Sequence, residues 1–117
     1  MSQQQRVQEL PNSEEYRRQL IRMSKYGMSY SKLLRLSVGK YGKIFGYFAD
    51  GKNGRCAVGA IVSELGWDGS NFDKPWSEIM GCIQLHAIHL GVNIVNDNDN
   101  NSLSWEEIAD KLEKVGL

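Results

Sequence analysis

The sequence predicts a single, mainly helical domain: a compact bundle of four or five helices with one small two-stranded β element. Apolar residues recur at helical spacing in several segments, and a Gly follows each of these segments. Only two short stretches, 44–48 and 92–95, are rich in the aromatic or β-branched residues that strands favour. The length of 117 residues and the hydrophobic share of 41% fit one globular domain.

The globular domain is expected to span residues 12–117, after a flexible polar tail of residues 1–11 that has no apolar periodicity. Asn12 or Ser13 is suited to cap the first helix, and Gly27 is suited to end it. No apolar run approaches the roughly 18 residues of a membrane-spanning helix, and the N-terminus lacks the apolar segment of a secretory signal. We therefore expect a soluble, cytoplasmic protein without a membrane partner.

The second helix is expected from about Ser29 to Val38, where Gly39 follows it. After this helix the period changes, and the aromatic segment 44–48 predicts a short strand. Its expected partner is a second short strand at 92–95, which completes the small β element.

The third helix is expected over residues 56–65, where apolar side chains occur on nearly every face. Such a pattern predicts a helix that is buried between its neighbours, with Gly66 at its C-terminal end. Gly59 costs a helix about 1 kcal/mol relative to Ala. Its presence therefore predicts a packing neighbour that leaves no room for a methyl group.

Two further helices are expected in the C-terminal half. Pro75 suits the first position of a helix whose apolar residues run from Trp76 to Leu90. Ser104 and Glu107 have the spacing of a capping box, in which each side chain accepts a hydrogen bond from the other residue's backbone N–H. The apolar faces together predict a core of Leu33, Val58, Ile61, Val62, Ile79, Ile83, Ile108 and Leu112.

The charges are divided unevenly along the chain, although the formal net charge is zero. Residues 1–55 contain 11 Lys or Arg and 4 acidic residues, whereas residues 56–117 contain 3 and 10, so that the halves carry +7 and −7. This division suggests an anionic partner for one face, a cationic partner for the other, self-association, or docking of the two halves on each other.

The basic half also interleaves cations with tyrosines, the mixture that phosphate contact and base stacking require. The candidate binding residues are Lys25, Tyr26, Tyr30, Lys32, Arg35, Lys40, Tyr41, Lys43, Lys52 and Arg55. A solvated helix face with tyrosines half in the core is the simpler interpretation, and no named nucleic-acid motif is present. The expected function is a non-catalytic interaction protein that binds a host protein or nucleic acid through this half.

A thiol-dependent enzyme or a metal-binding protein is the alternative function. Cys82, His86 and His89 stand at i, i+4 and i+7, so their side chains project from one helix face. Zinc would need a fourth ligand, such as Cys56 or Asp97, and no paired-Cys motif is present. Because a small buried Cys beside two partly exposed histidines explains the pattern more simply, no metal or cofactor is predicted.

The polar run from Asn96 to Glu107 has a superficial similarity to a calcium-binding loop. Asn96 stands where such a loop has Asp, and Asn101 stands where it has Gly. Moving the register by one residue places Ile108 at the last ligand position. A turn over residues 96–101 explains the composition, because Asn and Asp tolerate left-handed backbone angles.

Three motifs follow one another along the chain: Cys56-Ala57-x-Gly59-Ala60, Asn96-Asp97 and Glu107-Ile108-Ala109-Asp110. Together they resemble a family of small uncharacterised bacterial and phage proteins, which have a Cys-Ala-x-Gly-Ala helix, an Asn-Asp turn and a final amphipathic helix. The resemblance spans about residues 45–115, and Val95 departs from it because the family has an aromatic residue there. It implies a shared compact fold and a phage, plasmid or bacterial origin, and it implies no activity.

Overall fold

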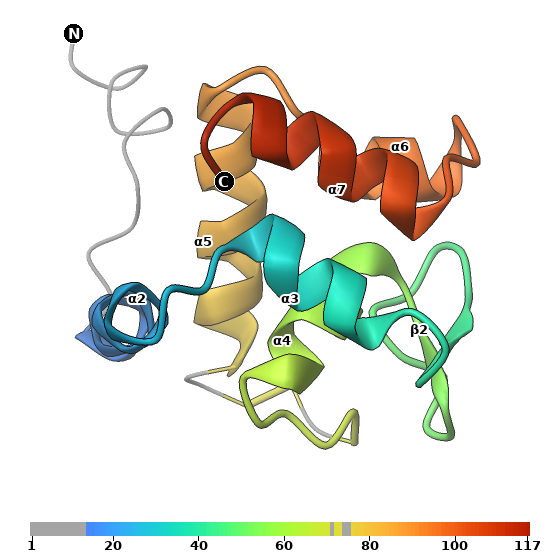
Figure 1. Cartoon of the computed structure of the whole chain (residues 1–117). Coiled ribbons are helices and arrows are strands. Elements are labelled where there is room, and N and C mark those ends of the chain that lie inside the picture. Colours follow the sequence, from blue (N-terminus) through green and yellow to red (C-terminus); the bar gives the residue numbers. More distant parts are fainter. Residues whose placement is uncertain (1–13, 71, 74–75) are drawn as a thin grey trace, which may run out of the picture.

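The computed structural model describes residues 14–70, 72–73 and 76–117, and this part of the chain is mainly helical, as the sequence predicts (Figure 1). Its helices are α2 (Glu14–Lys25), α3 (Tyr30–Ser37), α4 (Ala57–Glu64), α5 (Trp76–His89), α6 (Ile94–Asp99) and α7 (Trp105–Lys114). The expected tail of residues 1–11, the caps Asn12 and Ser13, and Pro75 lie outside the described residues.

Helix α4 lies at the centre of the molecule, between α3, α5 and α6 (Figure 1). Every residue from Ala57 to Ser63 is buried, which confirms the prediction of a helix without a solvent face. Cys56 is its N-cap, and the Sγ atom accepts a hydrogen bond from the Gly59 N–H at 3.4 Å. The neighbour that forbids a side chain at Gly59 is the Phe48 carbonyl oxygen, which a Cβ atom there would overlap.

The small β element differs from the predicted one. Strand β1 (Gly42–Lys43) pairs in parallel with β2 (Gly54–Arg55), and the predicted pairing of 44–48 with 92–95 is wrong. The second segment begins a helix instead, because the Asn93 side chain caps α6 by accepting a hydrogen bond from the Asn96 N–H at 3.1 Å. The local cap therefore prevails over the β propensity of the flanking Val and Ile residues.

Helix α6 replaces most of the turn expected over residues 96–101, and it brings the number of helices in the described residues to six rather than four or five. Asn98 gives this polar segment a structural role, since the residue is completely buried. Its Oδ1 atom accepts from the Ala57 N–H at 3.2 Å and the Trp105 Nε1–H at 3.1 Å, and its Nδ2 donates to the Ile44 carbonyl at 2.9 Å. One side chain thus links α4, α7 and the loop after β1.

The remaining local signals are confirmed. Ser104 and Glu107 form the predicted capping box of α7, with hydrogen bonds of 3.1 and 2.8 Å. No core residue predicted from the sequence exposes more than 1% of its surface; the eight are Leu33, Val58, Ile61, Val62, Ile79, Ile83, Ile108 and Leu112. Left-handed backbone angles occur at the glycines that were expected to end helices, namely Gly27, Gly39, Gly66, Gly91 and Gly116.

We expect Gly59→Ala to lower the free energy of unfolding by about 1–3 kcal/mol, because the added methyl group would displace the Phe48 backbone. Gly81→Ala is the matched control, since a Cβ atom at this exposed position on α5 would meet no heavy atom within 4 Å. The control should raise the free energy of unfolding by about 0.5–1 kcal/mol through helix propensity. Urea denaturation of the two variants measures both values, and equal effects would contradict the packing described for α4.

Candidate functional site

The basic and aromatic residues predicted to bind a partner fall into three groups: buried or partly buried residues, residues in ion pairs and exposed residues outside these ion pairs. Arg55 belongs to the interior, where only 4% of its surface is exposed. Its guanidinium donates to Ser63 Oγ at 2.8 Å and to the Asp68 carbonyl at 3.2 Å, between the rings of Tyr41 and Trp67 at 4.8 and 5.6 Å. This stacked, hydrogen-bonded guanidinium holds the β2 segment against α4 and the following loop.

Two other predicted cations are paired with the acidic half of the chain. Arg35 on α3 contacts Asp110 and Glu113 on α7 at 2.6 and 2.8 Å, and Lys40 contacts Glu64 at 3.0 Å. Some of the excess positive charge of residues 1–55 is thus paired within the fold with acidic residues of the second half of the chain.

Arg35 and Lys40 remain exposed in their ion pairs, and the other predicted residues that are exposed are Lys25, Tyr26, Lys32 and Lys52. Helix α2 extends this basic surface, because Arg17, Arg18 and Arg22 are also exposed. These three arginines are not among the binding residues predicted from the sequence. They lie opposite the buried stripe of Tyr16, Gln19 and Met23, so the helical period that predicts the buried face also indicates them.

A surface hollow of about 220 Å³ lies beside the C-terminal end of α2. Its lining residues are Arg22, Met23, Tyr26, Met28, Glu64 and Leu65. The Tyr26 side chain is 63% exposed, and the Nζ atom of Lys25 lies 5.8 Å from the centre of its ring. We name Arg22, Lys25 and Tyr26 the α2 patch, which combines one exposed aromatic ring with two cations.

A second group of exposed aromatic residues lies in the loop between β1 and β2. Phe45 is 51% exposed and Tyr47 is 73% exposed, and the Nζ atom of Lys43 lies 5.3 Å from the Phe45 ring. Figure 1 shows α2 at one side of the molecule and the β loops at the other, with α3 and α4 between them. The ten predicted residues therefore do not form one continuous surface.

The structure does not assemble the alternative thiol or metal site. Cys82 is completely buried, and burial raises the pKa of its thiol to about 11. Burial also raises the pKa of Cys56 to about 11, whereas His89 is exposed. No group of three or more His, Cys, Asp or Glu side chains in the described part of the chain is placed to hold a metal ion.

His86 instead joins two tyrosines, which sequence analysis did not connect with it. Its Nδ1 atom lies 3.0 Å from the Tyr16 hydroxyl and 3.1 Å from the Tyr30 hydroxyl, and the two hydroxyls are 2.6 Å apart. Burial raises the pKa of both tyrosines, and burial together with His89 lowers the pKa of His86. All three side chains are therefore uncharged at neutral pH.

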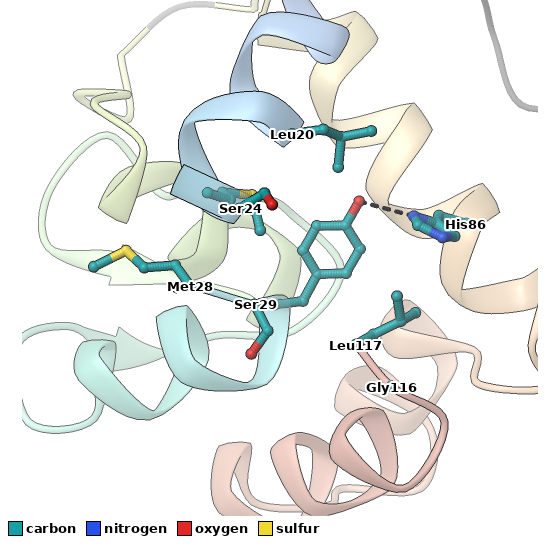
Figure 2. Close-up of a pocket in the computed structure, with 9 residues that line it drawn as sticks. Leu20, Ser24, Met28, Ser29, His86, Gly116 and Leu117 are labelled. Atoms are coloured by element: carbon teal, nitrogen blue, oxygen red, sulfur yellow. Dashed lines mark hydrogen bonds between the residues drawn. The ribbon is translucent and has the colours of Figure 1, made fainter. Parts of the chain in front are cut away.

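We name Tyr16, Tyr30 and His86 the hydrogen-bonding triad. Beside it lies a pocket of about 230 Å³ between α2, α3, α5 and the C-terminal end of the chain (Figure 2). Its lining residues are Leu20, Met23, Ser24, Met28, Ser29, Tyr30, His86, Gly116 and Leu117. Figure 2 shows Leu20, His86 and Leu117 converging from three parts of the chain, with Met28 on the opposite side. The main-chain oxygen of Leu117 accepts a hydrogen bond from the Ser31 N–H at 2.9 Å, which fixes this wall on α3.

No family model matches the chain, and no curated protein or solved structure matches it significantly. Among the described residues, no helix combines the length and the apolar character that crossing a membrane requires. Function must therefore be inferred from the sites themselves.

Both thiols should react with iodoacetamide at least about a hundredfold more slowly than free cysteine at pH 7.5, because a pKa near 11 leaves little thiolate. Mass spectrometry of the native protein measures the two rates. The control is the same reaction in concentrated urea, where Cys56 and Cys82 should both react at the ordinary rate. Rapid native alkylation of Cys82 would contradict its burial and restore the thiol-dependent alternative.

The free energy of unfolding should fall as the pH decreases below about 6.5, the ordinary pKa of His, because the unfolded state then binds a proton that folded His86 resists. The loss should stop once the pH is below the lowered pKa of the folded state. Urea denaturation between pH 7.5 and pH 5 measures it. His86→Gln should remove this dependence, whereas His89→Gln, at an exposed position, should retain most of it. Asp50 and Asp68, whose pKa values backbone hydrogen bonds lower, contribute only below about pH 4.

Proposed function

We propose that this chain is a non-catalytic interaction protein that binds single-stranded nucleic acid through the α2 patch. The observation that carries the proposal is the exposed Tyr26 ring, which has the Lys25 Nζ atom 5.8 Å from its centre and lines a hollow together with Arg22. A base that stacks on an aromatic ring contributes about 1–3 kcal/mol, and nearby cations neutralise the phosphates on either side.

We infer that two further exposed cations contact the phosphates of the same strand. Arg17 lies on the exposed face of α2, and Lys32 is exposed on α3, the next helix along the chain. Neither Tyr30 nor Arg55 takes part in the proposed contact, because both side chains are buried and hold the fold together. The proposed site is therefore smaller than the set expected from the sequence.

The absence of a catalytic role is part of the same proposal. It is supported by the two buried thiols of high pKa and by the position of His89 away from them in the solvent. A cytoplasmic location, expected from the polar N-terminal sequence, also belongs to it, as does an origin in a phage or mobile element, which rests on the small size and the family resemblance. An acidic surface of a host protein is the competing partner for the same cations.

Fluorescence anisotropy of a labelled oligothymidylate tests the nucleic-acid partner. The association constant should fall steeply with salt, with a log–log slope of about −2 if three phosphates are neutralised. Tyr26→Ala should weaken binding by about fivefold to a hundredfold, and Lys25→Gln should make the slope shallower. Tyr47→Ala is the matched control, because Tyr47 is as exposed as Tyr26 but lies in the loop on the other side of the molecule.

An equal loss in Tyr26→Ala and Tyr47→Ala would contradict the location of the site. Absence of salt-dependent binding to both DNA and RNA oligonucleotides would contradict nucleic acid as the partner. Retention of an acidic protein from host lysate by the wild type but not by Tyr26→Ala would then favour the competing protein partner.

A further inference from the structure

We propose that the pocket between α2, α3, α5 and the C-terminal end is a binding site for a small uncharged molecule with an apolar body and one hydroxyl group, such as a simple phenol. None of the three residues of the α2 patch lines the pocket, although Met23 and Met28 line both the pocket and the hollow beside the patch.

The size of the pocket sets the size of the molecule. A cavity of about 150 Å³ with apolar walls holds one benzene molecule. The volume here is about 230 Å³, so a substituted benzene ring of about nine non-hydrogen atoms fits it. Larger cofactors and nucleotides would exceed it, because such ligands occupy pockets of about 300–1,000 Å³.

The walls determine that the body of the molecule is apolar. Leu20 and Met23 from α2, Met28 from the connection to α3, and Leu117 supply flexible or branched apolar side chains. Met side chains adapt their shape and contact aromatic rings favourably. No Lys, Arg, Asp or Glu side chain lines the pocket among the described residues, so a charged ligand would be desolvated there without a side chain of opposite charge.

The hydrogen-bonding triad determines the polar group. Three contacts join Tyr16, Tyr30 and His86, but the two hydroxyls supply only two protons when Nδ1 is unprotonated. A chain from Tyr30 through Tyr16 to Nδ1 then leaves the Tyr30 oxygen able to accept a hydrogen bond. In the other neutral tautomer, Nδ1 donates to Tyr16, Tyr16 donates to Tyr30, and the Tyr30 proton is left to donate.

A ligand hydroxyl can pair with the Tyr30 hydroxyl in either tautomer of His86, because it can both donate and accept a hydrogen bond. A carboxylate only accepts and an ammonium only donates, so each suits one arrangement alone. Because Tyr30 and His86 are uncharged at neutral pH, the polar side chains that line the pocket also present no charge that favours an ion. The hydrogen-bonding triad and the apolar walls therefore both favour an uncharged molecule with an apolar body and one hydroxyl group.

Titration of the full chain with 4-ethylphenol, followed by two-dimensional ¹H–¹⁵N NMR, tests the proposal. We expect saturable shifts of the Tyr30, His86 and Leu117 backbone amides with a dissociation constant of about 0.1–1 mM. Ethylbenzene, which has the same shape without the hydroxyl, should bind about threefold to tenfold more weakly. Sodium 4-ethylbenzoate should bind more weakly still.

Leu20→Trp should abolish these shifts by filling the pocket. Ile21→Trp is the matched control on the same helix, because Ile21 is 68% exposed and does not line the pocket, and this variant should bind like the wild type. If Leu20→Trp does not fold, Met28→Trp fills the pocket from the opposite side. Unchanged binding in a folded filling variant, equal affinity for ethylbenzene, or no saturable shift with 4-ethylphenol would overturn the proposal.

Discussion

Burial of α4 on every face is the constraint on which the rest of the structure depends. A helix that exposes almost no apolar surface needs neighbours all round, and here α3, α5 and α6 provide three of them. The loop after β1 provides the fourth, since the Phe48 carbonyl approaches Gly59 too closely for a side chain. An irregular segment can cover a helix at this distance only if its own polar groups are satisfied, and this requirement explains the buried polar residues around it.

Arg55 and Asn98 satisfy those groups from two directions. Arg55 donates to the Gly54 carbonyl and to Ser63 on α4, and Asn98 donates to the Ile44 carbonyl while it accepts from the first N–H of α4. Because each makes several hydrogen bonds in the interior, removing either side chain would leave buried groups without partners. Their chemistry is that of ligand-binding residues, but their hydrogen bonds are already used within the fold.

The sequence predicted the local features and failed where distant segments meet. The capping box at Ser104 depends only on residues within one turn, and the core positions depend on a short period, so both were predicted correctly. The partner of β1 and the burial of Arg55 depend on which segments fold against each other, and residue type does not specify this. The exposed arginines of α2 do not depend on such contacts. The helical period that identifies the buried face of α2 also identifies its exposed face, so Arg22 could have been predicted.

Helix α2 connects the two proposed sites through its position at the edge of the fold. It packs mainly on α5, and the contacts of the Tyr16 hydroxyl with Tyr30 and His86 join it to α3 and α5. The inner face of the helix forms a wall of the pocket, and Tyr26 directly follows its C-terminal residue Lys25. A molecule that binds only when this wall is in place stabilises the docked helix by mass action. Linkage then requires that a partner which also needs the docked helix binds more tightly in the presence of that molecule.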